Sequence, residues 1–252
     1  MSEPVWNKFL TERDKAVFGD AGYGARAGFG KKPALLVIDV NYNFCGDTRE
    51  PILESIKKYR NSCGEDAWDA LPVIAKLAEA SRAKGIPVIY STGDGRGDGW
   101  DRGGWAWKNS RQSEDREPPA ARTSNRNGND IMDEIAPGPK DIVIEKLKPS
   151  VFNGTALMGH INNLGADSLI VTGTTTSGCV RATVIDAFSL NLRVTIAEEG
   201  CFDRSEASHA INLCDMNAKY ADVIAADEVL EHINGLDVED LDYNLPSGTP
   251  GA

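Results

Sequence analysis

The chain has 252 residues, enough for one α/β domain with a substantial buried core. Its formal net charge of -11 and its sequence pI of about 4.8 argue against nucleic acid and anionic membranes as partners. No stretch approaches the ~20 consecutive apolar residues of a membrane span, and the N-terminus has no apolar signal core, so we expect a cytoplasmic protein. Five cysteines without zinc-type spacing are typical of a reduced compartment rather than of a disulfide framework.

Strand and helix patterns alternate along the chain. Apolar runs predict six strands, at residues 34–39, 87–90, 141–145, 169–171, 193–197 and 221–224. Helical periodicity predicts helices within 46–68 and over 70–84, 155–164, 180–188, 205–220 and 227–234. We find no internal repeat and no linker, so we expect one domain over 1–252 that includes an N-terminal arm (1–32) and a C-terminal tail (235–252).

Residues 91–139 lack periodicity and hold three tryptophans, at positions 100, 105 and 107. Long irregular segments in compact domains are usually functional or disordered. Because tryptophans are costly to expose, we expect an ordered segment. It would cover the active site, contact another subunit or form a structural cluster of its own.

The alternation predicts a three-layer α/β/α fold, with a parallel sheet between two layers of helices. Ligands bind such sheets beyond the carboxyl ends of the strands, where the strand order reverses. Four polar residues follow expected strand ends: Asp39, Lys146, Cys179 and Arg204. In an order 3-2-1-4-5-6, Asp39 and Cys179 flank the reversal and Lys146 reaches back across one strand. Periodicity alone leaves that order open.

Cys179 lies where a strand turns sharply into a helix. The turn reads Thr172-Gly-Thr-Thr-Thr-Ser-Gly-Cys179, and apolar residues on a helical period follow it. The unpaired N–H groups and the positive dipole end of that helix favour a thiolate and can receive an oxyanion. The alternative is that Cys179 is a small buried hydrophobe, as free cysteines often are.

A thiol beside a carboxylate and an ammonium predicts a nucleophile. Thiolates attack carbonyl carbons, a carboxylate such as Asp39 can take the thiol proton, and an ammonium such as Lys146 stabilises the resulting charge. The three histidines, His160, His209 and His232, fall within expected helices and away from strand ends, which argues against a cysteine–histidine pair.

Three motifs resemble those of the isochorismatase-like cysteine hydrolases. They are Val37-Ile-Asp39, Lys146-Leu-Lys-Pro-Ser-Val-Phe-Asn-Gly-Thr155 and Val171-Thr-Gly-Thr-Thr-Thr-Ser-Gly-Cys179, in order and suitably spaced within about residues 33–225. The resemblance is strongest to the N-carbamoylsarcosine amidohydrolase branch. It implies the 3-2-1-4-5-6 parallel sheet, with Asp39 as the base, Lys146 as its charged partner and Cys179 as the nucleophile.

The same resemblance implies a cis peptide bond between Thr174 and Thr175, which turns the N–H groups of Thr175 and Cys179 inward as an oxyanion hole. Thr174 and Thr175 are then also expected to contact the substrate. The nicotinamidases of this superfamily carry metal-binding histidines shortly after the first strand. Residues 40–47 contain no histidine, so we expect no metal, no other cofactor and no nicotinamidase activity. The presence of Cys179 argues against the isochorismate-cleaving branch, which lacks the nucleophile.

Arg204 matches the position at which N-carbamoylsarcosine amidohydrolase holds the carboxylate of its substrate, and a guanidinium suits bidentate carboxylate binding. The alternative for Arg204 is a surface ion pair with Asp203 or Glu206.

We therefore expect a metal-free amidohydrolase acting on a small amide that carries a carboxylate. N-carbamoylsarcosine, cleaved to sarcosine, carbon dioxide and ammonia, is the first candidate. Maleamate or another N-carbamoyl amino acid is the nearest alternative, followed by a non-amide hydrolase of the superfamily and by a non-catalytic binding protein. The resemblance also implies a homo-oligomer, a dimer or tetramer, with the N-terminal arm and the tryptophan segment as candidate contacts.

Overall fold

A computed structural model of the chain describes residues 3–96, 98–108, 120 and 122–244. Six strands form one parallel sheet in the order β3-β2-β1-β4-β5-β6, which confirms the expected fold. The strands are β1 Pro33–Ile38, β2 Val88–Gly93, β3 Ile142–Lys146, β4 Ser168–Thr174, β5 Arg193–Phe202 and β6 Asp222–Ile224. Each includes most of a run that the sequence predicted, although β4 and β5 continue further toward the site than expected.

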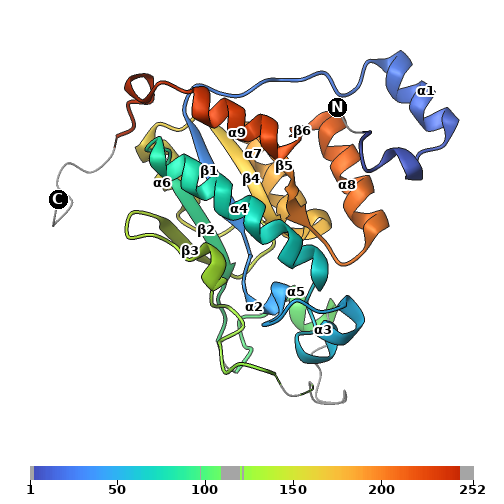
Figure 1. Ribbon diagram of the computed structural model, residues 1–252, viewed down its shortest axis with the longest axis vertical. Coiled ribbons are helices and arrows are strands. Elements are labelled where there is room, and N and C mark those ends of the chain that lie inside the picture. Colours follow the sequence, from blue (N-terminus) through green and yellow to red (C-terminus); the bar gives the residue numbers. More distant parts are fainter. Residues whose placement is uncertain (1–2, 97, 109–119, 121, 245–252) are drawn as a thin grey trace.

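Helices cover both faces of the sheet (Figure 1). One face carries α4 (Glu65–Ala83) and α9 (Ala226–Gly235), and the other carries α6 (Leu157–Leu164), α7 (Arg181–Ser189) and α8 (Glu206–Lys219). Successive side chains of β1 alternate between the two hydrophobic cores, with Leu35 and Val37 in one and Leu36 and Ile38 in the other. Burial on both faces explains the unbroken apolar sequence of this strand. Within the described residues, no helix is both long enough and apolar enough to cross a membrane.

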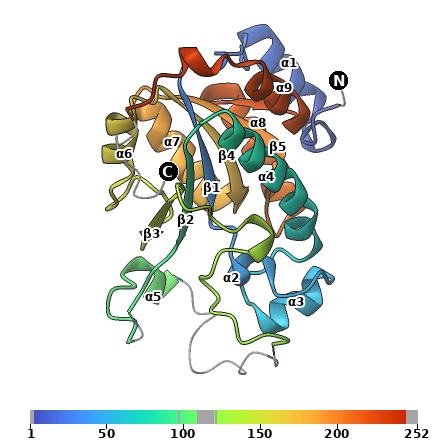
Figure 2. The same ribbon diagram turned by 60° about the vertical axis from the view of Figure 1, so that its left-hand side comes forward.

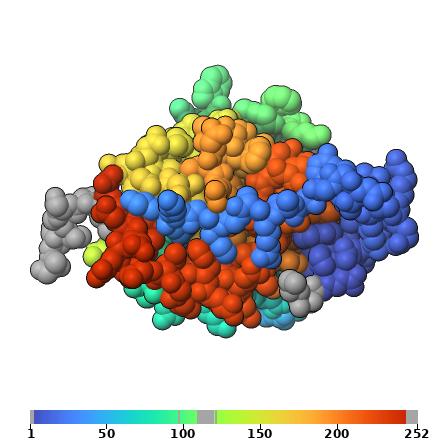
Figure 3. Space-filling view, turned by 90° about the horizontal axis from the view of Figure 1, so that it is seen from above, coloured from blue at the N-terminus to red at the C-terminus, as the bar shows by residue number. Residues whose placement is uncertain are grey.

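The N-terminal arm contains a helix that the sequence analysis missed, α1 (Glu12–Ala21). Thr11 and Asp14 form a capping box at its start. In Figure 3 the arm runs along the surface of its own subunit, with α1 at one end. The amides of Ala27 and Gly28 donate to the Asp222 carboxylate, which ties the arm to the end of the sheet that β6 forms.

The segment between β2 and β3 carries the three tryptophans on the surface of the chain. It contains the short helix α5 (Gly104–Lys108), and the indole of Trp105 donates a hydrogen bond of 3.2 Å to the Leu147 carbonyl. Trp100 and Trp107 are each 84% exposed in the single chain, and which of the three expected roles the segment has stays a prediction. Residues 109–119 and 121 of this segment lie outside the described part of the chain.

Two further helices, α2 (Tyr42–Cys45) and α3 (Ile52–Lys58), follow β1, and α4 begins at Glu65 rather than at Ala70 as predicted. Figure 2 shows α5 on the β3 side of the carboxyl edge of the sheet, with α2 and α3 on the other side.

A close backbone approach between β1 and β4 positions the site. Gly173 has a φ of +105°, and a Cβ there would lie 2.1 Å from the Ile38 carbonyl oxygen. Only glycine fits this conformation and this distance. The residues that follow the two strands, Asp39 and Thr175, are therefore held at the point where the strand order reverses.

Candidate active site

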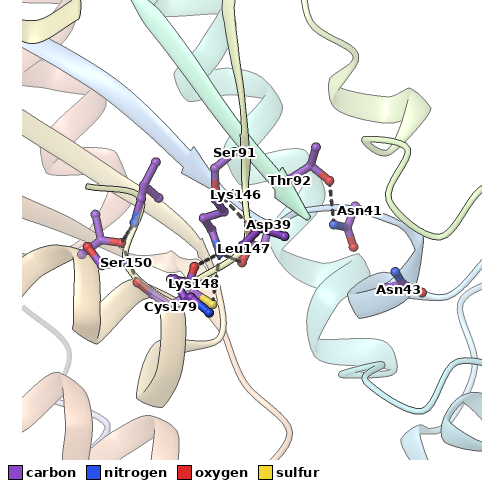
Figure 4. Close-up of polar contacts among 12 residues, drawn as sticks. Asp39, Asn41, Asn43, Ser91, Thr92, Lys146, Leu147, Lys148, Ser150 and Cys179 are labelled. Atoms are coloured by element: carbon purple, nitrogen blue, oxygen red, sulfur yellow. Dashed lines mark hydrogen bonds and ion pairs between the residues drawn. The ribbon is translucent and has the colours of Figure 1, made fainter. Parts of the chain in front are cut away.

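The carboxyl ends of three strands bring Asp39, Lys146 and Cys179 together (Figure 4). Lys146 Nζ lies 2.7 Å from Asp39 Oδ2 and 3.5 Å from Cys179 Sγ. The side chains of Lys146 and Asp39 are only 5% and 3% exposed. The structure thus brings the three residues that the sequence singled out together, with Asp39 and Cys179 both in contact with the buried ammonium of Lys146.

Asp39 is held by the neighbouring strand. It follows β1 with a φ of +54°, a left-handed conformation that aspartate tolerates better than most residues. Its amide donates to the Ser91 carbonyl at 3.0 Å, and the Ser91 hydroxyl donates to Asp39 Oδ1 at 2.9 Å. With Lys146 on Oδ2, both carboxylate oxygens have a partner. Sequence reasoning missed Ser91, whose only signal is a small polar residue near the end of a buried strand.

Lys146 is the last residue of β3, and its ammonium also donates to the Lys148 carbonyl at 3.1 Å. Burial by itself would lower the pKa of Lys146, but the Asp39 carboxylate and Cys179 outweigh it, so that the pKa is raised. The side chain is therefore a cation at neutral pH.

Cys179 sits in the elbow, which we define as residues 174–180. The peptide bond between Thr174 and Thr175 is cis, at the place that the resemblance implied. A π-helical turn, Thr176–Val180, leads from there into α7. A Cβ at Gly178 would lie 2.5 Å from Thr175 Oγ1, so a larger residue at this position would force the Thr175 side chain to move.

The thiol of Cys179 is protonated at neutral pH. Burial raises its pKa to about 12, and the Asp39 carboxylate acts in the same direction while Lys146 opposes it. Loss of solvent around the sulfur therefore outweighs the groups that stabilise the anion, and the expected contribution of the helix terminus stays a prediction. The resting site holds a thiol, a carboxylate and an ammonium.

Asp203, which follows β5, and His209, in α8, anchor the elbow. Sequence reasoning missed the role of each. Asp203 Oδ2 accepts from the Ser177 amide at 2.7 Å and from its hydroxyl at 2.6 Å. The Thr176 hydroxyl lies 2.8 Å from His209 Nδ1, and burial lowers the pKa of His209. Asp203 follows a strand end directly, a position that could have marked it as a candidate.

Arg204 does not form the surface ion pair considered above. Its guanidinium donates to the Asn61 carbonyl at 3.0 Å, and in the described part of the chain neither Asp203 nor Glu206 pairs with it. Thr174 uses its hydroxyl inside the protein, donating to the Phe202 carbonyl at 3.0 Å. The hydroxyl of Thr174 is therefore engaged inside the protein, and its expected contact with the substrate stays a prediction.

Asparagines tie the segment after β1 to β2 and to the loop before β3. Asn41 Nδ2 donates to Thr92 Oγ1 at 3.0 Å, and Asn43 Nδ2 donates to Asn129 Oδ1 at 2.8 Å. Among the described residues, no group of three or more histidine, cysteine, aspartate or glutamate side chains is arranged to hold a metal ion.

Comparison with known proteins agrees with this arrangement. The family model of the isochorismatase domain matches residues 33–228. N-carbamoylsarcosine amidase from Arthrobacter sp is 31% identical over 233 residues, covering 89% of this chain and 80% of that protein. Maleamate amidohydrolase from Pseudomonas putida is 26% identical over 217 residues, covering 85% of this chain and 92% of that protein. A solved cysteine hydrolase from Pseudomonas syringae pv. phaseolicola shares the fold, with a TM-score of 0.66 at 24% identity over 81% of this chain and 92% of its own. The chain therefore belongs to the isochorismatase family and is a hydrolase.

Proposed function

We propose that the protein is a cysteine amidohydrolase that cleaves a linear amide or carbamoyl C–N bond in a small substrate with a carboxylate. N-carbamoylsarcosine is the first candidate substrate. The observation that carries the proposal is the Lys146 ammonium within 3.5 Å of both the Asp39 carboxylate and the Cys179 sulfur. The two relatives compared above are named for amide hydrolysis, which supports the same reaction class.

The first step forms a bond between sulfur and the substrate carbon. Because the pKa of Cys179 is about 12, little thiolate exists beforehand, and the thiol proton passes to Asp39 as Sγ attacks the carbonyl carbon. The carbonyl electron pair moves onto oxygen. We assign the N–H groups of Thr175 and Cys179 as donors to that oxyanion, and the Thr175 amide has no acceptor among the described residues.

The second step releases ammonia. The oxyanion collapses, the C–N bond breaks, and the departing nitrogen takes the proton held by Asp39. Lys146, which is cationic, stabilises the carboxylate that Asp39 becomes again. Water then attacks the S-acyl intermediate, giving a proton to Asp39, and sulfur leaves and regains its proton. With N-carbamoylsarcosine, the N-carboxy product would lose carbon dioxide to give sarcosine.

Arg204 is the candidate partner of the substrate carboxylate. Its guanidinium is anchored by the Asn61 carbonyl through one N–H group, and the described residues offer it no carboxylate. A guanidinium with free donors suits a planar anion.

An ammonia-release screen tests the proposal. The panel contains N-carbamoylsarcosine, other N-carbamoyl amino acids, maleamate and nicotinamide, with Cys179→Ala as the matched control. We expect ammonia from one of the first three classes and none from the variant. Ammonia release at the native rate by Cys179→Ala would falsify the mechanism. Hydrolysis of esters or ethers without any ammonia would identify the non-amide alternative.

We also propose a homo-oligomer, a dimer or tetramer. Trp100 and Trp107 are each 84% exposed, and Val143, on the edge strand β3, is 46% exposed. Light scattering of the native protein and of a Trp100→Ser, Trp107→Ser double variant tests this contact. A native protein that is monomeric at micromolar concentration would rule it out.

A further inference from the structure

Thr183, four residues after Cys179 in α7, bridges two segments of the site. Its hydroxyl donates to the Cys179 carbonyl at 2.7 Å and accepts from the Val151 amide at 3.1 Å. A hydroxyl has one hydrogen and two lone pairs, so it can make both bonds at once. Thr183 and Val151 are both fully buried. The bridge is therefore made inside the protein, away from solvent.

The bond from Thr183 to Cys179 is ordinary by itself. Threonine hydroxyls in helices often donate to the carbonyl four residues earlier. The bond from Val151 is different, because it crosses 32 residues of sequence and ties α7 to another part of the site. Since Val151 is fully buried, its amide would be left without an acceptor if Thr183 lost its hydroxyl and nothing moved.

Val151 ends a short loop that begins at Lys146, and we call residues 146–151 the lysine loop. The Lys146 ammonium donates to the Lys148 carbonyl of the same loop at 3.1 Å (Figure 4), so the ammonium is tied to the loop backbone. In the part of the chain that the structure describes, two polar contacts join the lysine loop to the elbow and α7. One is Lys146 Nζ to Cys179 Sγ at 3.5 Å, and the other is Val151 to Thr183.

We propose that Thr183 is a positioning residue whose hydroxyl sets the distance between the Lys146 ammonium and the Cys179 sulfur. The inference rests on the proposed amide hydrolysis, in which the ammonium stabilises negative charge next to the sulfur as the thiol proton leaves. Asp39 holds the ammonium from the β1 side at 2.7 Å. Thr183 holds the other side, because one of its bonds fixes the Cys179 backbone and the other fixes the lysine loop. Without the hydroxyl, the loop and α7 lose the bond that sets their relative position.

Thr183→Val tests the role, because valine keeps the shape of the side chain and removes the hydroxyl. The assay is ammonia release from the amide that the native enzyme cleaves best. We expect kcat to fall about 10- to 100-fold, the range for displacing a catalytic group by about 1 Å. We expect KM to stay near its native value, because Arg204, the candidate partner of the substrate carboxylate, is anchored by Asn61 on another segment.

The alkylation rate of Cys179 is a readout that separates positioning from a general loss of stability. Lys146 opposes the effects that raise the pKa of this thiol. Moving the ammonium about 1 Å further from the sulfur weakens that opposition, so we expect iodoacetamide to label Thr183→Val about fivefold more slowly than the native protein at the same alkaline pH. Loosening of the fold would act in the opposite direction, because solvent and reagent would reach the sulfur more easily.

Two variants control for the loss of a buried side-chain group. Thr183→Ser keeps the hydroxyl and is expected to keep native kcat and native labelling. The matched control is Thr195→Val, since Thr195 is also buried, at 3% exposure, but lies in β5, outside the elbow and the lysine loop. We expect it to leave kcat and labelling unchanged. Thr183→Ala serves if Thr183→Val does not fold, because a water in the vacated space can accept from the Val151 amide.

Native kcat in Thr183→Val would overturn the inference while leaving the amidohydrolase proposal intact. So would a loss of kcat that Thr183→Ser shares, or one that comes with native or faster labelling of Cys179. A native enzyme that releases no ammonia from any amide would overturn the proposed function and the role of Thr183 in it.

Discussion

Asp203 holds the elbow through Ser177. One carboxylate oxygen of Asp203 accepts from both the amide and the hydroxyl of Ser177, at 2.7 and 2.6 Å, and the other accepts from the Arg204 amide at 2.7 Å. Asp203 is only 5% exposed. A single buried carboxylate therefore positions both the segment with Cys179 and the segment with Arg204.

We expect Asp203→Ala to lower kcat at least tenfold, because the elbow loses both anchors and the oxyanion donors lose their alignment. Ser177→Ala removes only the hydroxyl bond and keeps the amide bond. It should cost less than Asp203→Ala in a steady-state assay of ammonia release. Equal activities of the two variants would show that the carboxylate does not align the elbow.

Removing the ammonium should destabilise the fold as well as abolish activity. In Lys146→Met the Asp39 carboxylate, 3% exposed, loses its cationic partner. Leaving a buried charge unpaired typically costs about 3–5 kcal/mol, to be measured by urea denaturation. The double variant Lys146→Met, Asp39→Asn should recover part of that stability and remain inactive. Full stability of the single variant would contradict the burial of the pair.

The high pKa of Cys179 predicts its response to pH. At neutral pH we expect slow alkylation by iodoacetamide, with a rate that rises about tenfold per unit up to pH 9.5 and does not level off near the ordinary thiol pKa of about 8.5. Mass spectrometry of the labelled peptide assigns the rate to Cys179. An alkylation rate that levels off between pH 7 and 8 would instead show that the site stabilises the thiolate of Cys179. Slow labelling of Cys179 at neutral pH is therefore expected of the active enzyme too, and it is no sign of a non-catalytic binding protein.

The raised pKa of Cys179 also predicts that the folded protein loses stability at alkaline pH. The unfolded chain loses the thiol proton above about pH 8.5, whereas native Cys179 keeps it up to about pH 12. The unfolded state then binds fewer protons, so the free energy of unfolding falls as pH rises through this window. Burial also raises the pKa of Cys63 to about 12, which adds to the alkaline loss.

The sheet was predictable because its strands are continuous apolar runs bounded by polar residues, but their order was not. That order came from the resemblance of three motifs. The helix α1 was missed in a polar arm, and none of its residues is buried. Only the capping residues Thr11 and Asp14 marked it.

Asp39, Lys146 and Cys179 were predictable because Asp39 and Lys146 stand at strand ends and Cys179 lies in the turn that follows one. Ser91, Asp203 and His209 act through contacts across 52, 26 and 33 residues of sequence, and no local pattern encodes such pairs. The direction of the Cys179 pKa shift could not be predicted from the sequence either, because the loss of solvent around the sulfur depends on all the residues that pack against it.

Arg204→Gln should raise KM for the carboxylate-bearing amide about 10- to 100-fold, the range for losing one charge-assisted hydrogen bond, with a smaller effect on kcat. A neutral amide such as propionamide serves as the comparison substrate and should be affected less. Arg204→Lys keeps the positive charge but loses the two parallel N–H donors of the guanidinium. Its KM should lie between those of the native enzyme and Arg204→Gln. Equal losses on charged and neutral amides would mean that Arg204 acts only through its bond to Asn61.

Gly173→Ala should be the most destabilising of the glycine substitutions near the site. Its Cβ would meet the Ile38 carbonyl oxygen at 2.1 Å, and β1 and β4 would have to separate to make room. We expect a loss of about 3 kcal/mol or more in urea denaturation. Gly85→Ala is the control, since Gly85 has a φ of +71° and no atom within 4 Å of the added Cβ. Backbone strain alone predicts about 1–2 kcal/mol there. If the two variants were equally stable, the close approach of β1 and β4 would not be what requires Gly173.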